Sequence, residues 1–143
     1  MKGVVTLGAA LLLVACGGGE KKEAEEAPAT PAASAGGPAT PAANGKVIVI
    51  EAVSDEKGNY FSPNEVEAHK GDVLRFTLKV GVHNVDFLPD SNSHKSGLPP
   101  ASEMLQLPGQ TFDVPVNFDE GTYYFQCDPH AALGMHGHVK VED

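Results

Sequence analysis

The sequence has no tryptophan, only two cysteines and few aromatic residues among its 143 positions. With 6% aromatic residues, a hydrophobic core must be built mainly from Val, Leu, Ile and Phe. Basic residues are also scarce, since 10 Lys and Arg stand against 19 Asp and Glu, for a formal net charge of -9. Because binding to nucleic acid begins with neutralisation of phosphates by Lys and Arg, no nucleic-acid partner is expected. An acidic chain would sooner meet a basic protein.

The longest hydrophobic run lies near the N-terminus, at residues 4–14, after a short basic start. It is too short to span a membrane as a helix and is typical of an export signal. It leads into Leu-Val-Ala-Cys at residues 13–16, which resembles the bacterial lipobox, the motif whose Cys becomes the lipidated first residue of the mature chain. We therefore predict a signal peptide over residues 1–15 and lipidation of Cys16. The alternative is an ordinary signal peptide with a chance cysteine.

A low-complexity segment follows the predicted lipidation site. It is rich in Ala, Pro and Gly, and it shows no apolar periodicity, so it cannot bury a core. Residues 16–44 are predicted to be the lipidated Cys and a disordered tether, and residues 45–143 to be one folded domain. The domain is expected in the cell envelope, anchored by lipid, in the periplasm or on the extracytoplasmic face.

Alternating hydrophobicity predicts an all-β domain. In residues 74–80 every second side chain is apolar, which is the signature of a half-buried strand. Residues 88–106 are too rich in Ser, Pro and Asn for a strand, so we expect a long loop with a helical turn around residues 102–105. Further strand-like runs lie at residues 46–53, 82–87, 112–116, 122–127 and 139–141. Seven or eight short strands predict a Greek-key β-sandwich or barrel.

Three candidate metal ligands lie close together near the C-terminus, with the spacing Cys127-x2-His130-x4-Met135. Thiolate, imidazole and thioether are each soft or borderline ligands. They cannot converge from a straight strand, where neighbouring side chains point to opposite faces, but they can converge from a tight loop. Pro129 and Gly134 are placed to bend such a loop.

A fourth ligand must come from elsewhere, and His83 is the best candidate because it lies at the edge of an otherwise apolar segment. On its own it would be read as a structural histidine. Two imidazoles and a thiolate in a trigonal set, with a weak axial Met, form the blue-copper arrangement, so one type 1 copper ion is predicted. Zinc is the alternative, but structural zinc sites have little use for a thioether.

Residues 61–141 resemble the plastocyanin and pseudoazurin branch of the cupredoxins. The matching segments are His83-Asn84-Val85, the turn at residues 108–112 and the run at residues 121–130. The resemblance implies that His83, Cys127 and His130 are equatorial ligands and Met135 is axial. It also implies that Asn84 holds the ligand loop and donates a backbone N–H to the Cys127 sulfur. The lipobox and tether are similar to those of membrane-anchored relatives.

One position departs from the resemblance. Plastocyanins place a Tyr directly before the ligand Cys, on a second electron route, and this chain has Gln126 there. A photosynthetic role is therefore not implied.

The function that the resemblance implies is electron transfer through one Cu(II)/Cu(I) site. The chain would be a monomer that exchanges electrons with a redox protein donor and acceptor, and it would not be an enzyme. Copper delivery or storage is the alternative, motivated by His136 and His138, which alternate on the last predicted strand. These two histidines are either a second, weaker copper site or ordinary surface residues. A dinuclear copper centre needs two loop cysteines, and this loop has one.

Overall fold

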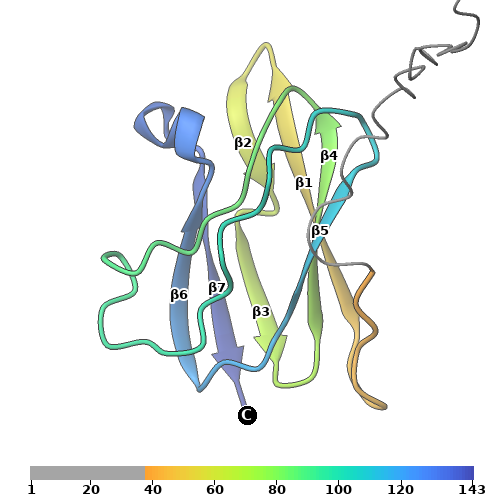
Figure 1. The fold of residues 1–143 in the computed structure, drawn as a ribbon, viewed down its shortest axis with the longest axis vertical. Helices are drawn as coiled ribbons and strands as arrows, with labels where there is room; N and C mark the ends of the chain where they lie inside the picture. Colours follow the sequence, from red (N-terminus) through yellow and green to blue (C-terminus); the bar gives the residue numbers. More distant parts are fainter. Residues whose placement is uncertain (1–37) are drawn as a thin grey trace, which may run out of the picture. The chain divides into compact units, whose positions relative to one another are not determined.

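The computed structural model describes residues 38–143. The predicted signal peptide, Cys16 and the predicted tether as far as residue 37 lie outside the described residues. Seven strands and one short helix follow one another along the chain (Figure 1): β1 (Val47–Asp55), β2 (Gly58–Ser62), β3 (Glu65–His69), β4 (Val73–Val80), β5 (Thr111–Pro115), β6 (Gly121–Gln126), the 3-10 helix η1 (Asp128–Leu133) and β7 (His136–Glu142). No helix among these residues is long and apolar enough to cross a membrane.

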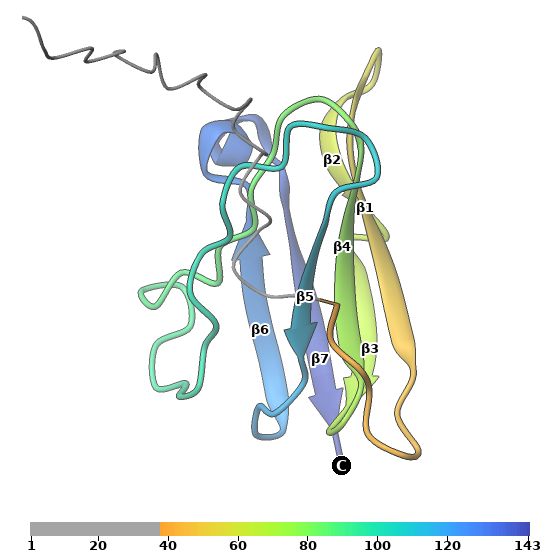
Figure 2. The same ribbon diagram turned by 45° about the vertical axis from the view of Figure 1, so that its right-hand side comes forward.

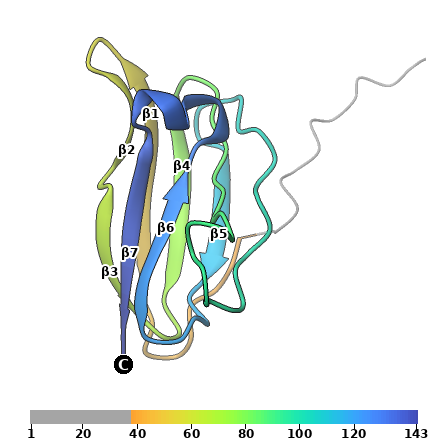
Figure 3. The same cartoon turned by 90° about the vertical axis from the view of Figure 1, so that its left-hand side faces the viewer.

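The strands form two sheets that pack face to face (Figures 1 and 2). The first sheet has the order β2-β1-β4-β5 and the second has the order β3-β7-β6. The predicted all-β sandwich of seven to eight strands is therefore confirmed, with seven strands. In all three views η1 lies at one end of the sandwich and the C-terminus at the other (Figure 3).

The alternation in β4, an inner strand of the first sheet, explains why one of its faces is buried in the core. Leu74, Phe76 and Leu78 are at most 1% exposed, whereas Arg75 and Thr77 between them are partly exposed. The ring of Phe76 contacts four other phenylalanine rings, at centroid distances of 5.1 to 6.4 Å. One of them is Phe125 of β6, which lies two residues before Cys127. The aromatic core therefore joins the two sheets beside the ligand loop.

The segment at residues 82–87 is not the continuous strand that its hydrophobicity predicts. It forms two isolated bridges, His83 with Leu105 and Asp86 with Gln126 of β6. Its first half thus pairs with one part of the chain and its second half with another, so no continuous ladder forms. This segment crosses between the two sheets, and the crossing places His83 beside the end of β6.

The long loop after this segment is confirmed for residues 88–106, but the predicted helical turn at residues 102–105 is wrong. Those residues are extended and pair with the crossing segment. The Ser102 N–H donates to the Val85 carbonyl at 2.9 Å, and the Leu105 N–H donates to the His83 carbonyl at 2.7 Å. Because these N–H groups donate to the crossing segment, they are not available for the hydrogen bonds of a helical turn.

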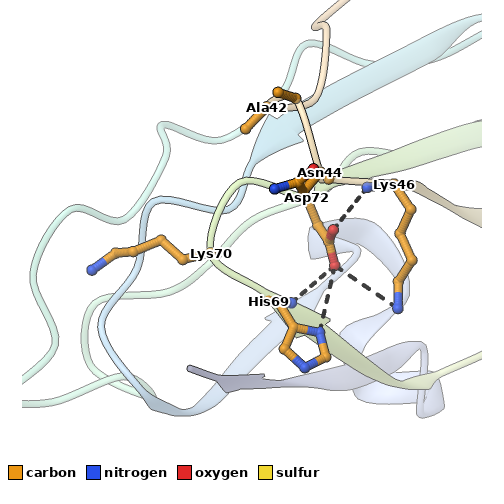
Figure 4. Close-up of a pocket in the computed structure, with 8 residues that line it drawn as sticks. Ala42, Asn44, Lys46, His69, Lys70 and Asp72 are labelled. Carbon is orange, nitrogen blue, oxygen red and sulfur yellow. Dashed lines mark hydrogen bonds and ion pairs between the residues drawn. The ribbon is translucent and has the colours of Figure 1, made fainter.

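Residues 38–44, which the sequence assigns to the tether, are hydrogen-bonded to the first sheet and its turns. The Ala42 N–H donates to the Gly71 carbonyl at 2.9 Å. Next to this contact, Asp72 accepts the N–H of Lys46 at 2.8 Å and the N–H of His69 at 2.9 Å (Figure 4). The start of β1 is therefore held against the turn between β3 and β4.

A second buried carboxylate, Asp113, holds the same segment further along the sheet. Arg75 donates two hydrogen bonds to Asp113, from Nε at 2.9 Å and from Nη2 at 2.7 Å. The Ala39 N–H donates a third, at 2.7 Å, and the Asp113 side chain is 1% exposed. Burial raises the pKa of this carboxyl, but the Arg75 and Ala39 hydrogen bonds and the Arg75 charge together bring the pKa below its ordinary value of 3.8.

We expect Asp113→Asn to lower the free energy of unfolding by about 1–3 kcal/mol at neutral pH, the usual worth of hydrogen bonds to a charged group. Because the folded-state pKa is depressed, the stabilisation is complete above the ordinary value of 3.8 and is lost as pH falls through the folded-state pKa. Urea unfolding between pH 7 and pH 2.5 measures this. The difference in the free energy of unfolding between wild type and variant should narrow as the pH falls below 3.8. Asp119→Asn, at an 82% exposed side chain, is the matched control, and an equal effect there would contradict the account.

Candidate metal centre

Three metal-binding side chains meet at the η1 end of the sandwich. The Nδ1 atoms of His83 and His130 are 3.2 Å apart, and the Cys127 Sγ lies 3.6 Å from the first and 3.3 Å from the second. Donor atoms held about 2.0–2.3 Å from one ion in a trigonal plane are roughly 3.4–3.9 Å apart. The three donor atoms therefore already have, within a few tenths of an ångström, the spacing that one ion requires.

The ligand loop bends as its sequence predicts. Strand β6 ends at Gln126, and η1 begins directly after Cys127 with Pro129 in its first turn. The His130 N–H donates to the Cys127 carbonyl at 3.0 Å, which closes this turn. Gly134 then ends the helix with a φ of 89°, a conformation that favours glycine. This tight turn brings the imidazole of His130 back over the sulfur of Cys127.

The tautomer of His83 leaves the nitrogen that faces the sulfur free to bind a metal. Its Nε2 lies 3.2 Å from the Val80 carbonyl, which can only accept, so Nε2 carries the proton. Nε2 also contacts the Ser54 hydroxyl at 3.0 Å. Burial, the largest effect, lowers the pKa of His83, the Val80 carbonyl raises it, and the His130 charge lowers it further. The neutral ring therefore presents an unprotonated Nδ1, and such an outer hydrogen bond is typical of histidine ligands.

Two residues that support His83 were not found from the sequence. Ser54 lies in β1, 29 positions away, and its hydroxyl donates to the Asn59 side chain at 2.5 Å while contacting the imidazole. Gly81 has a φ of 105°, and a Cβ there would lie 2.6 Å from the His83 Nε2. The glycine between β4 and His83 was the available signal, since close backbone approach is a common reason for glycine.

The surroundings of Cys127 favour a bound cation. Burial raises the pKa of the thiol, hydrogen bonds from the backbone N–H groups of Asn84 and His130 lower it, and the nearby charge of Asp128 raises it. The net direction is upward, so an uncompensated thiolate would be unfavourable in this site. A metal ion would supply the missing positive charge. The donor set, one thiol and two imidazoles in a buried site, thus fits a soft or borderline metal.

Asn84 joins the segment of His83 to the ligand loop. Its side chain accepts the Asp128 N–H at 2.8 Å and donates to the Asp128 carboxylate at 2.7 Å. Gln126 also donates to this carboxylate, at 2.9 Å. Together with its backbone contact to the Cys127 sulfur, Asn84 therefore holds both sides of the site in register.

Met135 is fully buried and lies directly after the ligand loop. Its carbonyl accepts the Cys127 N–H at 3.1 Å, and its own N–H donates to the His130 carbonyl at 3.2 Å. The structure thus brings the donor atoms of His83, Cys127 and His130 into mutual contact and places the backbone of Met135 beside them. Metal binding by the Met135 sulfur stays a prediction. Cys16, the predicted lipidation site, lies outside the described residues.

The chain is similar in sequence to known copper-binding proteins. A family described as copper binding proteins, plastocyanin/azurin family, matches residues 48–142. Plastocyanin from Vicia faba is 37% identical over 102 residues, which cover 66% of this chain and 99% of that protein. Plastocyanin A/B from Petroselinum crispum is 36% identical over 94 residues, covering 62% of this chain and 93% of that protein.

Solved structures show the same likeness. A mutant plastocyanin of fern matches with a TM-score of 0.51 and 30% identity, over 66% of this chain and all of that one. Pseudoazurin from Methylobacterium extorquens AM1 matches with a TM-score of 0.52 and 29% identity, over 68% of this chain and 76% of that one. The match to the family covers both sheets and all four residues predicted to bind the metal.

Proposed function

The chain belongs to the plastocyanin/azurin family of copper-binding proteins, a cupredoxin family, and on this premise we propose that it carries single electrons between redox proteins of the cell envelope. Copper is its cofactor. The observation that carries the proposal is the contact among the Cys127 sulfur and the two Nδ1 atoms of His83 and His130. Bound to such a set, copper supplies reversible one-electron chemistry between Cu(II) and Cu(I).

The residues that would hold the copper are His83, Cys127, His130 and Met135. The protein's contribution is to keep these side chains still. His83 is fixed by the Val80 carbonyl and Ser54, and the ligand loop is fixed to the neighbouring segment by Asn84. A donor set that moves little between the two oxidation states favours fast electron transfer, because little reorganisation is needed.

The proposed point of electron exchange is His130. His83 and Cys127 are buried, whereas His130 is partly exposed. Leu133, three residues on in η1, is 69% exposed, and Val82 beside His83 is 46% exposed. Exposed apolar side chains next to a ligand support close, dry contact with a partner protein. The acidic charge of the chain further favours a partner with a basic surface.

The envelope location is proposed from the N-terminal motif. The apolar run and the Cys at position 16 support export and lipid attachment, with the domain on the extracytoplasmic side as a monomer. The substitution Cys16→Ala removes the residue proposed to carry the lipid. It should move the protein from the membrane fraction to the soluble fraction. An unchanged membrane fraction would contradict lipid anchoring at this residue.

Spectroscopy and voltammetry of the copper-loaded full chain test the proposed function. An electron carrier should show an intense thiolate-to-copper band, an EPR spectrum with narrow hyperfine splitting and a reversible one-electron wave. A pale protein that binds only Cu(I) would instead support copper delivery or storage. The absence of a reversible wave from a blue protein would contradict electron carriage while leaving copper binding intact.

A further inference from the structure

A second pair of histidines lies on the outer surface of the second sheet. His136 and His138 are separated by one residue in β7, so both side chains point to the same face. Gly137 and Val139, which alternate with them, are buried on the opposite face. His136 is exposed, and the His138 side chain is 38% exposed. Two imidazoles therefore stand side by side, facing solvent.

A carboxylate from the neighbouring strand fixes the tautomer of His138. Its Nδ1 lies 2.8 Å from the Glu65 carboxylate of β3, which accepts, so Nδ1 carries the proton. In the neutral ring the Nε2 then has a free lone pair. A histidine whose other nitrogen donates to a carboxylate is the usual form of a histidine metal ligand. Glu65 would thus be a positioning residue, which orients His138 through the nitrogen that does not bind the metal.

Tyr124 of β6 restricts both rings. Its ring stacks on His136 with a centroid distance of 5.6 Å and an interplanar angle of 29°. It also meets the edge of His138 at 5.6 Å and 65°. Contact with one rigid ring limits the rotamers of both histidines, so less entropy is lost when a ligand orders them.

The spacing of the two rings fits one metal ion between them. Their centroids are 6.4 Å apart. An imidazole nitrogen binds such an ion at about 2 Å, so two rings on opposite sides of one ion have centroids about 6 Å apart. Nitrogen ligands in a tetragonal geometry are typical of Cu(II) and Ni(II), and Cu(II) binds nitrogen ligands more tightly than the neighbouring divalent metals. We propose that His136 and His138 form a second, solvent-facing site that binds Cu(II).

This site is separate from the buried centre in its chemistry. It has no thiolate and is open to water, so a bound Cu(II) would have nitrogen and oxygen ligands only. Glu65 of β3 lies opposite His138 and adds negative charge, which attracts a divalent cation. The proposal does not depend on electron carriage, and it gives the chain a capacity of two copper ions.

Stepwise titration of the full chain with Cu(II) tests the second site. The first equivalent is followed by the thiolate band, and further binding is followed by calorimetry and EPR. We expect a second equivalent that adds no visible thiolate band and shows the wide hyperfine splitting of tetragonal copper. His136→Asn and His138→Asn should each weaken the second equivalent about tenfold or more and leave the first unchanged, which also shows that the variants are folded.

Matched variants separate this site from general surface binding. Glu65→Gln should weaken the second equivalent by about 10-fold or more, the usual effect of removing the carboxylate behind a histidine ligand. His69→Asn and His94→Asn, at exposed histidines elsewhere on the domain, should leave it unchanged. A stoichiometry that stays at one, or a second equivalent that persists in the His136→Asn, His138→Asn double variant, would overturn the proposal.

Discussion

Replacing Cys127 with alanine should abolish the intense visible absorption of the copper-loaded chain. The band arises from charge transfer between the thiolate and the metal, and Cys127 is the one thiol among the described residues, buried between His83 and His130. Without it only imidazole and thioether donors remain, and these give weak d–d absorption and weaker Cu(II) binding. The visible spectrum during a Cu(II) titration measures both effects, and copper affinity should fall by at least about 100-fold.

Cys16 provides the matched control for this variant. It is the other of the chain's two cysteines. Cys16→Ala should leave the band at full intensity, because the proposed role of that residue is lipid attachment. An intense band that survives in Cys127→Ala would show that another group gives rise to the absorption, and the assignment of the site would be wrong.

Truncation of Phe76 to alanine is expected to destabilise the fold by about 3–5 kcal/mol, the usual cost of removing a buried phenylalanine. The side chain is fully buried in β4 and contacts rings from both sheets. Its loss leaves a cavity at the centre of the sandwich, which neighbouring rings fixed on separate strands cannot fill by collapse. Guanidinium unfolding of the copper-free chain measures the change in the free energy of unfolding.

Val49→Ala is a suitable control for this measurement. Val49 is 50% exposed, and its truncation should change stability by no more than about 0.5 kcal/mol. A loss below about 1 kcal/mol for Phe76→Ala would mean that the aromatic cluster does not hold the sheets together.

The strands that the sequence predicts correctly are those whose burial follows from local alternation. In β4 the alternating positions 74, 76 and 78 are buried as predicted, although Val73 is buried as well and Val80 is 43% exposed. In β5 the apolar Phe112 and Val114 are buried, and Asp113 between them is buried by its contacts with Arg75 and Ala39. A period of two is visible without any knowledge of the partner strand, so the fold class could be predicted from local sequence alone.

The features that were missed depend on contacts between distant residues. The segment at residues 82–87 has the composition of a strand, but its bridges lead to Leu105 and to Gln126, in two separate parts of the chain. Likewise, Asp113 holds Ala39 across 74 positions. The local sequence does not indicate such contacts. The composition of residues 38–44, for example, is that of a linker.

Some residues of the candidate site could likewise be predicted from local sequence, and others could not. Cys127, His130 and Met135 lie within nine residues, and their spacing with Pro129 and Gly134 predicts a ligand loop. His83 lies 44 positions from Cys127. It could be singled out only together with the downstream ligand loop, because a single histidine at the edge of an apolar segment would otherwise be read as structural. The resemblance implies that Asn84 holds the ligand loop, but its partner Asp128 and the role of Ser54 became visible only in three dimensions, since their hydrogen bonds span 44 and 29 positions.

A crystal structure of the copper-loaded chain, with anomalous scattering recorded at the copper edge, tests the central claim most directly. The account predicts an anomalous peak at the η1 end of the sandwich, bonded to the Cys127 Sγ and to the Nδ1 atoms of His83 and His130. A copper ion bound to Cys127 while the imidazole of His83 lies out of bonding range would contradict it.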